Sequence, residues 1–156
     1  MSAHPEWTHQ LFSDEDLDAI AAAIAAAERT TSGEIRVHLE PRLPHSRGGE
    51  KPDALARARA VFTTLGMQRT ADRNGVLIYL AIEDRQLAVL GDEGIHARVG
   101  AEYWEHVRDV MVDRFRAQAP RDGVVMAVTD VAEVLRRFFP RSPDDRNELT
   151  DQVSLG

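Results

Sequence analysis

Residues 73–94 of this 156-residue chain run RNGVLIYLAIEDRQLAVLGDEG, with two apolar segments on either side of a charged turn at Glu83, Asp84 and Arg85. Two apolar segments joined by so few polar residues predict an antiparallel hairpin, with strands near residues 75–82 and 86–91. Because both segments are almost continuously apolar, we expect helices to cover both faces of the sheet.

The segments on either side of the hairpin alternate between helical and strand patterns. Ser13 is a good N-cap for a first helix, and residues 34–40 alternate polar and apolar side chains as a strand does. A second helix ends before Gly66, a third carries Trp104, and a fourth ends before Pro140. The order α-β-α-β-β-α-α contains one parallel, right-handed βαβ unit. It predicts the α/β class: a single-domain α/β/α sandwich with a small mixed β-sheet covered by helices on both faces.

The composition excludes several classes of function. The formal net charge of −7 argues against a nucleic-acid partner, which would need a basic face. The absence of cysteine excludes disulfides, thiol catalysis and zinc–thiolate sites. No apolar run approaches the roughly 18 residues of a transmembrane segment, and the first ten residues lack the apolar region of a signal peptide. The sequence therefore predicts a cytoplasmic protein.

Acidic side chains are expected to converge at the open end of the predicted hairpin. The hairpin returns Asp92 and Glu93 to the neighbourhood of Asp72 and Asn74, and parallel pairing places Glu34 beside Asn74. Mg²⁺ and Ca²⁺ prefer several carboxylate and carbonyl oxygens in one place. The five residues are therefore candidate ligands of a divalent cation, and glycines 91 and 94 would let the backbone bend around it. The alternative is that these are ordinary solvated acids at strand ends.

Two further places carry weaker signals. Arg36 and His38 share the polar face of the strand at 34–40, which we expect to be half exposed. They form either a phosphate-facing pair or, as the pattern favours, a plain exposed strand face. Asp84 lies in the hairpin turn at the opposite end, where aspartate is favoured for local reasons. The residues alone favour a plain turn, and Asp84 is a reserve metal ligand only through the family resemblance described next.

An ordered series of short motifs resembles the TPM-domain family. The series is Thr31-Ser32-Gly33-Glu34-Ile35-Arg36-Val37, Arg73-Asn74-Gly75-Val76-Leu77, Asp84-Arg85 and Gly91-Asp92-Glu93-Gly94-Ile95, continued by Trp104, Met111, Phe115, Gly123 and Phe138-Phe139-Pro140. The nearest likeness is to the short, soluble bacterial members, which share the downstream stretch at 144–149. The likeness divides the chain into an N-terminal extension at 1–11, a TPM domain at 12–140 and a polar C-terminal tail at 141–156.

The resemblance implies an α/β/α sandwich, binding of Mg²⁺ or Ca²⁺, and phosphatase or nucleotide-hydrolase activity in some members. Larger members carry an acid directly before Asn-Gly-Val, where this chain has Arg73, and its nearest acid is Asp72. Without a phosphate-binding loop motif, hydrolysis of a phosphate ester or nucleotide would have to rely on metal-assisted attack. Arg73 and Arg36 are the candidates for offsetting phosphate charge. The competing hypothesis is a non-catalytic interaction module, in which the tail or the loop at 40–51 engages a protein partner.

Overall fold

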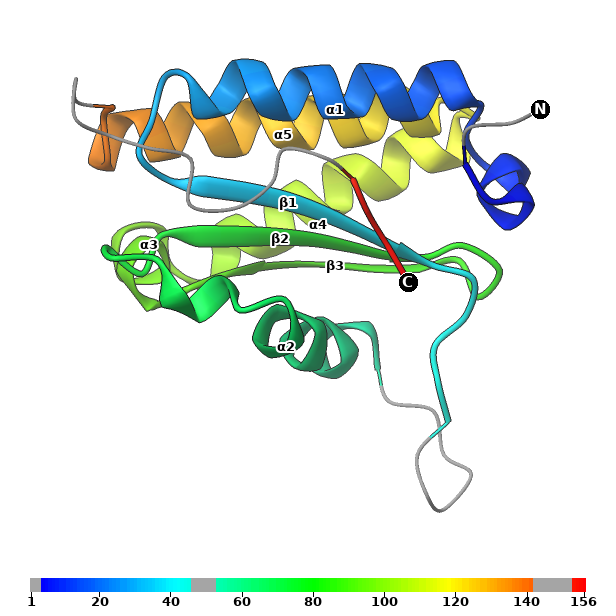
Figure 1. The fold of residues 1–156 in the computed structure, drawn as a ribbon, viewed down its shortest axis with the longest axis horizontal. Coiled ribbons are helices and arrows are strands. Elements are labelled where there is room, and N and C mark those ends of the chain that lie inside the picture. The colour runs from blue at the N-terminus through cyan, green and yellow to red at the C-terminus, as the bar shows by residue number, and fades with distance from the viewer. Residues whose placement is uncertain (1–3, 46–52, 142–152) are drawn as a thin grey trace.

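The computed structural model describes residues 4–45, 53–141 and 153–156, so the stretch at 144–149 and most of the loop at 40–51 lie outside the described residues. Figure 1 shows the fold. In chain order the elements are η1 (Glu6–Gln10), α1 (Asp14–Glu28), β1 (Glu34–Glu40), α2 (Ala54–Thr64), η2 (Met67–Arg69), β2 (Gly75–Ala81), β3 (Gln86–Gly91), α3 (Glu93–Val99), α4 (Ala101–Arg116), α5 (Pro120–Phe138) and β4 (Ser154–Leu155).

Local capping starts the helices that precede the first two strands. The Ser13 hydroxyl accepts the Asp16 N–H at 3.0 Å, and the Asp16 carboxylate accepts the Ser13 N–H at 2.9 Å. This reciprocal pair satisfies two backbone donors at the start of α1. The Asp53 carboxylate does the same for the Ala56 N–H of α2 at 2.7 Å.

The sheet has the strand order β3-β2-β1-β4. Strands β1 and β2 run parallel, with Glu34 opposite Gly75 and Glu40 opposite Ala81. Strands β2 and β3 are antiparallel, with Val76 opposite Gly91. The predicted hairpin and the mixed sheet are therefore confirmed.

Helices cover both faces of the sheet. Figure 1 shows α1, α4 and α5 on one face and α2 on the other. The larger core cluster joins the three helices to one face of the strands, and a smaller cluster joins α2 to the other face through Leu77 and Tyr79. All seven residues of β2 are buried. This arrangement confirms the predicted α/β/α sandwich, and no helix in the described ranges is long and apolar enough to cross a membrane.

The polar face of β1 is not exposed, so that expectation is wrong. The exposed fractions of Glu34, His38 and Glu40 are 2%, 6% and 5%, and Arg36 is partly buried. The face is turned toward α2, whose Arg57 covers Glu40, while the C-terminal residues cover His38. Alternation alone cannot distinguish a face covered by polar partners from one covered by water.

The C-terminal residues form a strand that the sequence did not indicate. Ser154 and Leu155 pair in parallel with His38 and Leu39, and the Gly156 N–H donates to the Leu39 carbonyl at 2.9 Å. This pairing covers the outer edge of β1 at His38 and Leu39, where backbone groups would otherwise be unpaired.

Candidate functional site

The hairpin brings its two open ends together, as the sequence predicts. The Asp92 N–H donates to the Gly75 carbonyl at 2.9 Å, and the Gly94 N–H donates to the Arg73 carbonyl at 2.7 Å. Residues nearly twenty apart in the chain are thus neighbours at the start of β2. The acidic end, defined here as Asp72, Arg73, Asp92 and Glu93, is formed by these contacts.

Arg73 holds the Asp92 carboxylate at this end. The guanidinium donates from Nε to Oδ2 at 2.8 Å and from Nη2 to Oδ1 at 3.1 Å. The Asp92 side chain is 6% exposed, whereas the Arg73 side chain is 44% exposed, so the pair lies at the boundary of core and solvent. The hydrogen bond to Asp92, and then the charges of Asp92 and Glu93, raise the pKa of Arg73. Arg73 also has a left-handed backbone conformation, with φ of 51°.

Asp92 also begins helix α3, and the glycines on either side of this start allow close packing, Gly91 against α4 and Gly94 against the backbone that precedes β2. The Asp92 Oδ1 accepts the Glu93 N–H at 2.8 Å. A Cβ at Gly91 would lie 2.1 Å from the Trp104 ring, and a Cβ at Gly94 would lie 2.1 Å from the Asp72 carbonyl oxygen. Close packing thus requires both glycines. The sequence had instead suggested that they let the backbone bend around an ion.

Glu34 does not join Asp92 in one cluster. Gly75 lies between them in the sheet, and a Cβ at Gly75 would lie 3.3 Å from the Met67 carbonyl oxygen and 3.7 Å from the Phe62 ring. Met67 and Phe62 therefore fill the space over the residue that separates the two acids.

Glu34 instead lies near Arg36 and Glu28, an acid that the sequence analysis missed. The Glu28 Oε1 accepts the Ile35 N–H at 2.8 Å. Burial lowers the pKa of Arg36, and the charges of Glu28 and Glu34 act in the opposite direction. Glu28 is the last residue of α1, and the signal that could have marked it as buried is its position four residues after Ile24 on the apolar stripe of the helix.

Asn74 lies between these two groups of charges. Its Nδ2 donates to the Ser32 hydroxyl at 3.3 Å, and its backbone N–H donates to the Thr70 hydroxyl at 3.3 Å. Its Oδ1 is buried and accepts no hydrogen bond from the described residues. This amide oxygen is a buried acceptor that a cation could satisfy.

The described residues contain no group of three or more His, Asp or Glu side chains placed to hold a metal ion. Of the predicted ligands, Asp92, Glu93, Asp72 and Asn74 lie at or beside the acidic end. Their role in metal binding stays a prediction.

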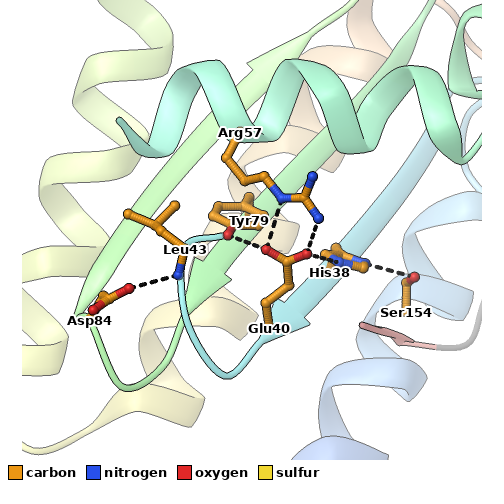
Figure 2. Close-up of polar contacts among 7 residues, drawn as sticks. All are labelled: His38, Glu40, Leu43, Arg57, Tyr79, Asp84 and Ser154. Atoms are coloured by element: carbon orange, nitrogen blue, oxygen red, sulfur yellow. Dashed lines mark hydrogen bonds and ion pairs between the residues drawn. The ribbon is translucent and has the colours of Figure 1, made fainter. Parts of the chain in front are cut away.

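The opposite end of the parallel strands holds a buried polar network on the α2 side of the sheet. Figure 2 shows Glu40 at its centre. Glu40 accepts hydrogen bonds from Arg57 Nε at 3.0 Å, from Arg57 Nη2, and from the Tyr79 hydroxyl at 2.5 Å. His38 Nε2 lies 3.5 Å from Glu40 Oε1, and its Nδ1 lies 2.9 Å from the Ser154 hydroxyl. The network joins β1, β2, α2 and β4.

The protonation of this network follows from its partners. Burial raises the pKa of Glu40, but the hydrogen bonds from Arg57 and Tyr79 and the nearby positive charge outweigh it, so the net pKa is lowered. Burial and the hydrogen bond to Glu40 raise the pKa of Tyr79. Burial lowers the pKa of His38 despite the attraction of Glu40, and Arg57 and Arg36 add to the lowering. The network is thus an ionised Glu40–Arg57 pair beside a neutral imidazole.

Asp84 has a structural partner in the hairpin turn. Its Oδ2 accepts the Leu43 N–H at 2.7 Å and so ties the segment after β1 to the turn after β2 (Figure 2). The structure thus separates this reserve ligand from the acidic end by the length of β2.

Several residues of the network escaped sequence reasoning. Arg57, Tyr79 and Ser154 lie on three different elements, and no short spacing connects them. The sequence did contain one indication of the network. Glu40 lies two residues after His38 on β1, so the two side chains face the same side of the sheet.

The fold is a small α/β/α sandwich. Gly91, at the end of its hairpin, packs against Trp104. The TPM domain family model matches residues 7–134, so the chain belongs to the TPM-domain family. The BA42 protein of the psychrophilic bacterium Bizionia argentinensis has an NMR structure similar to this one, at 36% identity and a TM-score of 0.80, covering 93% of this chain and 95% of that chain. The N-terminal domain of a P. gingivalis protein shares the fold at 19% identity and a TM-score of 0.64, covering 80% of this chain and 76% of that chain. No curated protein sequence matches the chain.

We expect the buried His38 to make the free energy of unfolding decrease as the pH is lowered. Because its folded pKa lies below the ordinary value of 6.5, the unfolded chain binds a proton first as the pH falls through that value. The free energy of unfolding should then drop by up to about 1.4 kcal/mol per pH unit until the folded imidazole also protonates. Urea unfolding at several pH values between about 7.5 and 5, above the range in which most carboxyl groups titrate, measures this slope.

His38→Gln should flatten that slope, while His106→Gln, at an exposed position of α4, should leave it as in the wild type. An unchanged slope in His38→Gln would show that His38 does not titrate as its burial requires.

Proposed function

We propose that this TPM domain binds a divalent cation, Mg²⁺ or Ca²⁺, at the acidic end, and that Arg73 competes with the ion for Asp92. The observation that carries the proposal is the two-point contact of the Arg73 guanidinium with Asp92. The Asp92 carboxylate is largely buried, but the Arg73 guanidinium that it binds is partly exposed. A metal ion from solvent could therefore replace the guanidinium at Asp92.

The local charge supports cation binding at this end. Asp72, Asp92 and Glu93 carry three negative charges against the single positive charge of Arg73, which leaves an excess of two negative charges. Asp72 and Glu93 are both exposed, so neither has lost its access to an ion in solvent. Hard cations accept carboxylate, amide and water oxygens together.

The residues that would hold the ion are Asp92, with Glu93 and Asp72 at the rim, and Asn74 through its orphaned Oδ1. The fit is partial, since the described residues hold no ready-made group of three acids or histidines. When bound, the ion would supply a Lewis acid for a phosphoryl oxygen. Larger members of the family carry an acid at the place of Arg73. Because this chain has a positive charge there, we expect it to bind the cation more weakly than those members do.

Cation binding should raise the melting temperature of the purified protein. A ligand that binds only the native state stabilises it by RT ln(1 + [L]/Kd), about 2.7 kcal/mol at a hundredfold excess over Kd. Asp92→Asn should reduce the shift given by Ca²⁺ or Mg²⁺. Arg73→Asn should increase it, because asparagine tolerates the left-handed backbone while removing the competing charge.

Two variants serve as controls for this experiment. Glu102→Gln removes one exposed acid from α4 and should leave the shift unchanged. Asp84→Asn tests the reserve ligand at the other end of the sheet. A shift abolished by Asp84→Asn and retained in Asp92→Asn would contradict the proposed location.

Hydrolysis should be weak or absent. Arg73 is engaged by Asp92, and Arg36 is partly buried and already attracted by the charges of Glu28 and Glu34, so neither guanidinium is free to meet a phosphate. We expect little turnover of an aryl phosphate and at most slow, metal-dependent hydrolysis of ATP, measured as released phosphate.

Turnover that persists in excess chelator would contradict a metal-dependent hydrolase. Metal-dependent turnover abolished by Asp92→Asn would instead favour the enzyme over the binding module. Cation binding without turnover would support the non-catalytic interaction module.

A further inference from the structure

A cavity of about 920 Å³ opens at the end of the hairpin opposite the acidic end. It lies between the β2–β3 turn, the residues that follow η1, and the junction of α4 with α5. Its walls are apolar where Leu11, Leu80, Leu87, Val112 and Phe115 line it. Its size and mixed lining are those of a small-molecule pocket, which is typically about 300–1,000 Å³.

The charge at the rim of this cavity is positive, in a protein that is acidic overall. Arg85 and Arg116 both line the cavity, both are exposed, and neither has an ion-pair partner among the described residues. Glu83 also lines it, but its carboxylate is already held by Arg42 at 3.1 Å and by Gln10 at 3.2 Å. The two guanidinium groups therefore remain available to an anion.

A neighbouring hollow of about 560 Å³ shares Arg85 and Arg116 with the cavity. It adds Arg108, which pairs with Asp109 at 3.0 Å, and the exposed Asp113. This acid disfavours an anion in the neighbouring hollow, so the main cavity is the better anion site.

The backbone supplies an independent observation at two rim positions. Of the three described non-glycine residues with a left-handed backbone, Arg85 with φ of 53° and Gln118 with φ of 58° both line this cavity. Such positions usually carry glycine, because other side chains are strained there. The cavity rim thus carries long polar side chains at two places where the backbone alone favours glycine.

The local geometry shows why glycine would be expected at each place. Arg85 closes the hairpin turn, where its N–H donates to the Ile82 carbonyl at 3.3 Å. Gln118 follows the end of α4, where its N–H donates to Phe115 at 3.1 Å and the Ala119 N–H donates to Arg114 at 2.9 Å. These two bonds form a Schellman motif, in which glycine is the common residue at the position of Gln118. Non-glycine residues with a left-handed backbone around a cavity point to a role for their side chains.

We propose that this cavity binds a small organic anion with an apolar body. The carboxylate or phosphate head contacts Arg85 and Arg116, Gln118 hydrogen-bonds to it, and the body lies on the apolar wall. Arginine suits both heads, because its planar donors match carboxylate and phosphate oxygens. The site is separate from the acidic end and does not depend on the cation proposal.

The test is a titration of the full chain with octanoate and octyl phosphate, followed by backbone amide NMR. We expect shifts confined to residues 10–11, 80–87 and 112–120, the segments that line the cavity. Inorganic phosphate tests the head alone and octanol tests the body alone, and each should bind at least tenfold more weakly than the whole molecules. Binding of only one of the two amphiphiles would support the proposal and identify the head group.

Glycine variants separate binding from folding. Arg85→Gly and Gln118→Gly relieve backbone strain, so their melting temperatures should equal or exceed that of the wild type. Arg85→Gly should weaken binding about tenfold or more, since it removes a charged hydrogen bond to the head. Arg69→Gln, which removes an exposed positive charge elsewhere, should bind as the wild type does.

Three results would overturn the proposal. The first is that neither amphiphile binds. The second is that both glycine variants bind as tightly as the wild type. The third is that Arg69→Gln weakens binding as much as Arg85→Gly, which would reduce the effect to overall charge.

Discussion

Strand β2 is buried on both faces, and this constraint limits where charged groups can lie on the sheet. Helices α1, α4 and α5 pack against one face and α2 against the other, so a charged side chain beside β2 is wholly or partly buried. A buried charge is tolerated only when it is paired and hydrogen-bonded. Glu40 meets this condition through Arg57 and Tyr79, whereas the exposed charges of Asp72, Glu93, Arg85 and Arg116 lie at the two ends of the hairpin.

The two ends of the hairpin have different chemistry because different elements close them. At the start of β2, helix α3 begins on Asp92, and the surplus of acids there is offset only by Arg73. At the end of β2, the turn and the last turn of α4 present Arg85 and Arg116 above an apolar wall. One end is therefore suited to a cation and the other to an anion, although the protein as a whole is acidic.

The hairpin and the layers could be predicted from the sequence because continuous apolar runs allow few alternatives. The contact between residues 73 and 92 also followed, since it depends only on hairpin register. The ion pair between Arg73 and Asp92 did not, because hairpin register fixes the backbone positions but not the direction of a long side chain, and Arg73 has a left-handed backbone. The burial of His38 depends on Ser154, which is more than a hundred residues away and belongs to a strand too short to have a pattern.

Cation binding at the acidic end is tested most directly by a Ca²⁺ titration of the wild-type protein, followed by ¹H–¹⁵N correlation spectra. We expect progressive, saturable shifts of the amides at 72–74 and 92–94, because Arg73 must leave Asp92 as the ion binds. Shifts confined to the neighbourhood of Asp84, with the amides at 92–94 unmoved, would contradict it.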